Sequence, residues 1–221
     1  MSKIRVAVLI SGRGSNMAAL LAAAAAPDYP AEIVLVLSNR PEAAGLLKAA
    51  AADIPAAVVD HKDFASRADF EAALDVRLVE TGIQLVCLAG FMRLFTPWFI
   101  ERWRDRLLNI HPSLLPAFRG LRTHERVLEA GARVTGCTVH LVRAEMDEGP
   151  IIAQAAVPVL AEDTPESLAA RVLETEHRLY PHALGLLASG AARVAGDRVV
   201  IPDEPPPAAP LFSPALRAEP H

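Results

Sequence analysis

The chain has 221 residues, of which 52% are hydrophobic and 22% charged, and its formal net charge is -4. This length and composition suit one α/β domain with a sizeable core. The acidic balance and the lack of a long basic run exclude the electrostatic footprint of a nucleic-acid-binding protein. The longest uncharged apolar stretch, residues 17–27, is too short to span a bilayer.

The N-terminus and the cysteines indicate the cellular compartment. The opening "MSKIRVAVLI" runs straight into a strand-like segment and lacks the small-residue cleavage site of a secretory signal. The two cysteines, Cys87 and Cys137, lie in apolar segments, which is typical of reduced, buried thiols. We therefore expect a cytoplasmic protein without a membrane partner.

Strand-like and helix-like segments alternate along the first half of the chain. Short apolar runs predict strands at residues 4–10, 32–38, 54–59, 84–89 and 106–110. Helices are predicted between them, from about residue 16 and at 41–52, 64–81 and 97–103. The alternation predicts an α/β fold: an open, mostly parallel, Rossmann-like twisted sheet with helices on both faces.

The alternation of strands and helices ends after Gly120. A short helix is expected at 123–130, then two longer strands at 133–142 and 151–159 joined by the polar turn "RAEMDEGP". A long helix follows, with Thr164 as N-cap and Pro165 at its first position. We expect one domain over residues 1–201 and a proline-rich C-terminal tail over 202–221, extended or disordered.

A glycine loop, "SGRGSN" at residues 11–16, joins the first strand to the first helix. Unpaired backbone N–H groups at such a helix start favour an anion, but a turn needed only for packing is equally compatible. A dinucleotide fingerprint is excluded, because Met17 replaces its third glycine and Ser38-Asn39-Arg40 lacks its acid. The Walker sequence is absent too, so the loop favours a monophosphate.

Asn109 and His111 lie at the carboxyl end of a central predicted strand, where open α/β sheets bind ligands. Residues two apart in a strand share one side, so both side chains can face one cleft. An amide and an imidazole together can stabilise an oxyanion and move a proton. Pro112 and Pro116 stiffen the next loop. Taken alone, the pair fits two side chains bound to loop carbonyls better.

Two further carboxylates, Asp147 and Glu176, can each be explained without a functional role. Glu145, Asp147 and Glu148 form an acidic turn, which is solvated unless it folds against the strand end and brings Asp147 to the imidazole. Glu176 lies on the apolar stripe of the long helix. A carboxylate there needs a partner, which is either a buried arginine or a substrate amine.

The motifs together resemble a known family. In chain order they are "VLISGRGSN", "LAGFMRLFTPWFI", "LLNIHPSLLPAFRGLRTH", "VTGCTVHLV", "MDEGPIIAQ" and "TEHRLYP". They look like folate-dependent phosphoribosylglycinamide formyltransferases, over residues 4–190. The resemblance implies an enzyme that transfers a formyl group from 10-formyltetrahydrofolate to the amine of 5-phosphoribosylglycinamide in purine synthesis. It also implies a monomer or homodimer that needs small-molecule substrates but no metal and no nucleic acid.

The resemblance also implies roles for individual residues. The catalytic set would be Asn109, His111 and Asp147. The substrate phosphate and glycinamide would be bound by Gly14, Ser15, Asn16 and Glu176. The folate would be bound by Arg67, Met92, Arg93, Leu94, Phe95, Asn109, Arg143, Ala144, Glu145, Met146 and Asp147. Arg122 stands where the family commonly has histidine, which leaves the substrate contacts at that position open.

Three alternatives stay open at this point. A methionyl-tRNA formyltransferase shares "SLLP" but would carry a C-terminal nucleic-acid-binding domain. A formyltetrahydrofolate hydrolase would carry an extra N-terminal regulatory domain, whereas strand one here starts at Ile4. A phosphate-binding regulatory module would keep the glycine loop without needing Asn109, His111 and Asp147 together.

Overall fold

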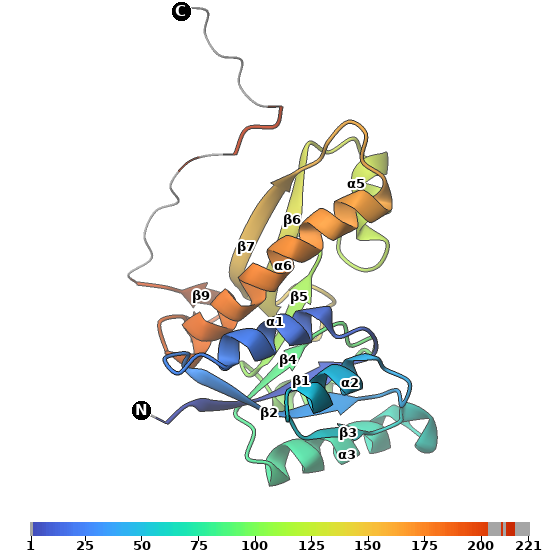
Figure 1. Cartoon of the computed structure of the whole chain (residues 1–221), viewed down its shortest axis with the longest axis vertical. Coiled ribbons are helices and arrows are strands. Elements are labelled where there is room, and N and C mark those ends of the chain that lie inside the picture. The colour runs from blue at the N-terminus through green and yellow to red at the C-terminus, as the bar shows by residue number, and fades with distance from the viewer. Residues whose placement is uncertain (1, 203–208, 210, 215–221) are drawn as a thin grey trace, which may run out of the picture.

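The computed structural model of the protein describes residues 2–202, 209 and 211–214. Its centre is a seven-stranded sheet with the strand order β3-β2-β1-β4-β5-β6-β7 (Figure 1). The strands are β1 (Ile4–Ile10), β2 (Ala31–Ser38), β3 (Ala56–Val58), β4 (Leu85–Leu88), β5 (Leu107–His111), β6 (Val134–Leu141) and β7 (Ile151–Pro158). Strands β1 to β5 are mutually parallel, β6 is antiparallel to β5, and β7 is antiparallel to β6. The expected mostly parallel α/β sheet is confirmed.

Helices cover both faces of the sheet. The elements are α1 (Ser15–Ala24), α2 (Gly45–Ala51), η1 (His61–Asp63), α3 (Arg67–Glu80), α4 (Pro97–Arg102), α5 (Thr123–Glu129) and α6 (Pro165–Ala188). One hydrophobic cluster joins the sheet to α1, α5 and α6, and a second joins it to α3 and α4. Alternate residues of β1 enter the two clusters, Val6 and Val8 the first and Ala7 and Leu9 the second, because successive strand residues point to opposite faces.

The first turns of the helices explain where they begin. Thr164 accepts from the backbone N–H of Ser167 and forms a capping box with it, and Pro165 follows as expected. Ser66 caps α3 in the same way, accepting from Asp69 N, so this helix begins at Arg67 rather than at residue 64. The helix expected at 41–52 begins at Gly45, whose N–H donates to Gly12 O at 2.9 Å.

Two features differ from the sequence expectation. The third strand is shorter than residues 54–59, because only Ala56–Val58 pair with β2 at the sheet edge. A hairpin of β8 (Arg193–Ala195) and β9 (Arg198–Val200) follows α6, and no strand was expected there. Most of the tail at 202–221 lies outside the described residues. None of the helices in the described ranges is long and apolar enough to cross a membrane.

Candidate functional site

Three loops that carry the predicted residues leave the same edge of the sheet. Strands β1, β4 and β5 are neighbours and parallel, so their carboxyl ends lie side by side. The glycine loop follows β1, residues 89–96 follow β4, and His111 is the last residue of β5. This edge is the usual ligand-binding position in open α/β sheets.

The acidic turn folds against the end of β5. Asp147 Oδ2 lies 3.4 Å from His111 Nδ1, and both side chains are at least nine-tenths buried. The backbone N–H of Gly120 donates to the same carboxylate oxygen at 2.8 Å. The other ring nitrogen, His111 Nε2, lies 3.0 Å from Phe118 O. The imidazole is thus held between two acceptors, and Asp147 is a partner of His111 rather than a solvated surface carboxylate.

Asn109 is oriented by His140, a residue that the sequence reasoning missed. Asn109 and His140 are directly opposite on the antiparallel strands β5 and β6, and Asn109 Nδ2 lies 3.2 Å from His140 Nε2. The other ring nitrogen of His140 lies 3.1 Å from Leu141 O. Burial lowers the pKa of His140, which favours the neutral ring. In the tautomer that donates from Nδ1 to Leu141 O, the Nε2 atom accepts from Asn109. One N–H of the Asn109 amide is then occupied, and the other is free for a ligand.

His140→Leu tests this orientation. The substitution keeps an apolar volume but removes the acceptor of the Asn109 amide, so the amide loses its fixed position. If Asn109 is catalytic, as the family resemblance predicts, kcat should fall about 10- to 100-fold, which is no more than the loss of one whole oxyanion donor costs. Steady-state kinetics beside a thermal melt measure this. In an Asn109→Ala background, His140→Leu should cost little more, and a full additional loss would contradict the assignment.

The glycine loop and Glu176 meet through Asn16. Gly14 adopts a left-handed conformation (φ 64°) at the start of α1, and no side chain caps that helix. Asn16 Nδ2 donates to Glu176 Oε2 at 2.7 Å, and both side chains are buried. Burial raises the pKa of Glu176, although the bond from Asn16 opposes the rise. The partner of Glu176 is therefore the Asn16 amide, and not the buried arginine that the sequence left open as an alternative.

The loop after β4 is tied to the glycine loop by two further residues that the sequence did not single out. Met92 N donates to Ser11 Oγ at 2.8 Å, and Ser11 Oγ donates to Asn39 Oδ1 at 2.6 Å. At the far end of the loop, Thr96 N donates to Glu71 on α3 at 2.7 Å. The segment 92–95, predicted to bind folate, is thus fixed at both ends. Arg67 precedes Glu71 by one helical turn and is exposed.

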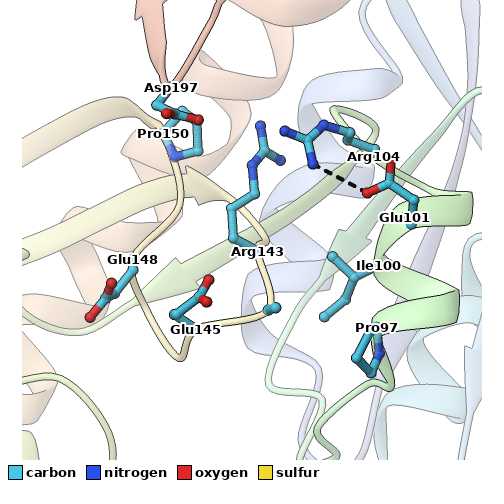
Figure 2. Close-up of a pocket in the computed structure, with 10 residues that line it drawn as sticks. Pro97, Ile100, Glu101, Arg104, Arg143, Glu145, Glu148, Pro150 and Asp197 are labelled. Carbon is cyan, nitrogen blue, oxygen red and sulfur yellow. Dashed lines mark hydrogen bonds and ion pairs between the residues drawn. The ribbon is translucent and has the colours of Figure 1, made fainter.

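A cavity of about 500 Å³ opens between α4 and the acidic turn (Figure 2). Its walls are Pro97, Ile100, Glu101, Arg104, Arg143, Ala144, Glu145, Glu148, Pro150 and Asp197. Three predicted folate residues, Arg143, Ala144 and Glu145, line it. The others, Arg67, Met92, Arg93, Leu94, Phe95, Asn109, Met146 and Asp147, do not. Asp197 belongs to the β8–β9 turn, which the sequence reasoning did not anticipate.

Two remaining observations concern charged side chains near the site. Arg122, the departure from the family pattern, is mostly exposed and pairs with Glu125 at 2.7 Å, so it faces its own helix. Within the described ranges, no group of three or more His, Cys, Asp or Glu side chains is arranged to hold a metal ion.

Fold and site together define an open α/β protein with an acid–base cluster and an unpaired helix start at the carboxyl edge of its sheet. A family model described as "Formyl transferase" matches residues 4–184. The chain therefore belongs to the formyl transferase family.

Three similar proteins are consistent with this membership. The phosphoribosylglycinamide formyltransferase of Haemophilus influenzae is 41% identical over 86% of this chain and 90% of its own length. The trifunctional purine biosynthetic protein adenosine-3 of Gallus gallus is 54% identical over 87% of this chain, but the chain spans only 19% of that protein. The crystal structure of glycinamide ribonucleotide transformylase 1 from Symbiobacterium toebii matches with a TM-score of 0.88 and 49% identity, covering 91% of this chain and 95% of that one.

Proposed function

We propose that this chain transfers the formyl group of 10-formyltetrahydrofolate to the amine of 5-phosphoribosylglycinamide, a step of purine synthesis. Relatives that bear this activity in their names match nearly the whole of the formyl transferase region. The observation that carries the proposal is the contact of Asp147 with His111 at 3.4 Å, beside an Asn109 amide with one N–H free. The enzyme would act in the cytoplasm, as a monomer or homodimer, without a nucleic-acid or membrane partner.

The first chemical step is direct attack. The amine nitrogen forms a bond to the formyl carbon, and the carbonyl electron pair moves onto the formyl oxygen. The free N–H of Asn109 donates to that oxyanion and contributes about 3 kcal/mol, and the positive charge of protonated His111 stabilises it electrostatically. The carboxylate of Asp147 lies 3.4 Å from Nδ1 of that ring and attracts its positive charge. The enzyme forms no covalent bond to the substrate.

The second step returns the proton. The bond between the formyl carbon and the folate nitrogen breaks, and its electron pair takes up the proton that the attacking amine releases. His111 and Asp147 carry this proton, through water where they do not reach directly. The proposed reaction needs no metal, because the charge that develops on oxygen is met by Asn109 and His111.

The two substrates would lie on opposite sides of this cluster. The substrate phosphate binds at the start of α1, to Gly14, Ser15 and Asn16, where backbone N–H groups and the helix dipole favour an anion. Glu176 accepts from the glycinamide amine. The folate lies along the 92–95 loop and residues 143–147, with Arg67 at its glutamyl end.

A direct assay tests the proposal. Protein, 10-formyltetrahydrofolate and 5-phosphoribosylglycinamide are mixed, and deformylation of the folate is followed by absorbance. We expect turnover only when both substrates are present. Equal turnover without the amine substrate would instead indicate a hydrolase, and turnover with initiator tRNA would indicate the tRNA enzyme.

Gly14→Ala should weaken binding of the phosphorylated substrate. A Cβ at this position would lie 2.9 Å from the Gly45 Cα, and the φ of 64° is unfavourable for alanine. The loop must therefore shift, and we expect the KM for 5-phosphoribosylglycinamide to rise about tenfold, the cost of one weakened charge-assisted hydrogen bond. Folate binding, measured by fluorescence titration, should stay nearly unchanged.

Gly190→Ala is the matched control for this variant. Gly190 has a φ of 76° and open space around an added Cβ, so it carries the backbone strain at a place outside the site. It should lower the melting temperature and leave both KM values unchanged. If Gly14→Ala impaired folate binding as much as phosphate binding, the loop assignment would be wrong.

A further inference from the structure

The turn that carries Asp147 receives little support from its own backbone. It joins β6 to β7, and its base is closed by Leu141 N donating to Pro150 O at 2.9 Å. Among the described residues, no backbone–backbone hydrogen bond joins positions 143–149 to another element. The position of the turn therefore depends on its side chains.

Asp147 itself needs external support. Its φ is 57°, a left-handed conformation that a non-glycine residue keeps only when its surroundings impose it. Two residues later, an added Cβ at Gly149 would lie 1.6 Å from Leu141 O, so the chain re-enters β7 in close contact with β6. Small movements of the turn would therefore displace the carboxylate from His111.

Two ion pairs flank Asp147 in the turn, and they differ in burial. Arg143 Nη2 lies 2.5 Å from Asp105 Oδ1; the aspartate side chain is 39% exposed, but the arginine side chain is only 11% exposed. Glu148 pairs with Arg119, and those side chains are 43% and 41% exposed. An exposed pair contributes little, because water competes for both charges. The Arg143–Asp105 pair is thus the stronger anchor of the turn.

The side chain of Arg143 is directed to this anchor more than to a ligand. It extends from the turn away from Glu145 and Glu148 (Figure 2). Its Nη1 donates to Val142 O at 3.1 Å, and its Nε is buried without a partner. A nitrogen that water cannot reach is closed to a ligand as well. Asp105 lies between α4 and β5, so the pair joins the turn to the segment that leads into the catalytic strand.

We infer that Arg143 and Asp105 are positioning residues that hold the turn so that Asp147 stays against His111. This inference rests on the proposed function, and it gives Asp105 a role in the reaction. It also changes the role of the Arg143 side chain from a folate ligand to a support for a catalytic carboxylate.

The test compares Arg143→Ala in two backgrounds. In the otherwise native chain, the variant should lower kcat about 10- to 100-fold at saturating substrates, because displacement of a catalytic group by about 1 Å costs this much. In an Asp147→Asn background, measured by single-turnover kinetics, the same change should lower the rate less than about twofold, since residues that act as a unit are not additive. Asp105→Asn should behave like Arg143→Ala in both.

Glu148→Gln is the matched control, because it breaks the exposed ion pair of the same turn. It should leave kcat close to that of the native chain. Equal losses for Arg143→Ala in both backgrounds would overturn the inference, as would a rise in the KM for folate with kcat unchanged, which indicates a ligand contact.

A second measurement does not depend on activity. The Gly120 N–H donates to Asp147 Oδ2, so its hydrogen-exchange rate, followed by NMR, reports where the carboxylate lies. Arg143→Ala should speed exchange at Gly120, and Glu148→Gln should not. Unchanged exchange in Arg143→Ala would overturn the inference even if the native chain had another activity. If the native chain transferred no formyl group but Arg143→Ala still exchanged faster at Gly120, the proposed function would be wrong and the positioning role would stand.

Discussion

Asp147→Asn should abolish most of the turnover and leave the fold intact. The amide is nearly isosteric, can still accept from Gly120 N, and tolerates the left-handed backbone that this position requires. It cannot stabilise a charged His111 or carry a proton. We expect kcat to fall about 10²- to 10⁴-fold, the range for loss of general acid–base catalysis. Steady-state kinetics and a thermal melt, run side by side, measure the two effects.

Glu148→Gln separates this result from a general effect of charge in the acidic turn. Glu148 is adjacent in sequence, but its partner is the exposed Arg119, so its loss should change stability by no more than about 0.5 kcal/mol. If Asp147→Asn and Glu148→Gln had equal effects on kcat, Asp147 would leave the catalytic set. Asn109 and His111 would then remain, and the proton would need another route.

The sheet could be predicted from sequence because local signals and burial agree. Uninterrupted apolar runs marked the parallel strands, and Thr164 with Pro165 marked the start of the long helix. The boundaries of α2 depend on tertiary contact, because Gly45 packs against the glycine loop. The β8–β9 hairpin has strands of three residues each, too short for a periodic pattern to identify.

The site could be predicted only in part. Asn109 and His111 share a face by the two-residue period of a strand, so their proximity follows from sequence. His140 became visible only with the register of β5 against β6, which places it opposite Asn109. The contact of Asp147 with His111 depends on the path of a turn that lacks a backbone pattern of its own. Its signal in the sequence was the resemblance to a family, not the spacing of its residues.

Glu176→Gln should raise the melting temperature at neutral pH and weaken binding of 5-phosphoribosylglycinamide. Burial raises the pKa of Glu176 above that of an unfolded chain, so keeping the ionised carboxylate buried costs stability. This cost is absent below the unfolded pKa and grows as the pH rises through the folded pKa. Glutamine does not ionise, and its carbonyl can still accept from Asn16. The melting temperatures of the two proteins should therefore agree in acid, and the variant should become the more stable one as the pH rises.

The activity of Glu176→Gln should fall although its stability rises. A neutral amide accepts more weakly from the substrate amine than a carboxylate does, so the KM for 5-phosphoribosylglycinamide should rise about 10- to 100-fold. The matched control is Glu174→Gln on the same helix, because Glu174 is exposed and should change neither the KM nor the pH dependence of melting. A Glu176→Gln variant with native KM would remove Glu176 from the substrate site. A variant that melted below the native protein at neutral pH would show that the carboxylate stabilises the fold, which is the reverse of what its burial beside an amide predicts.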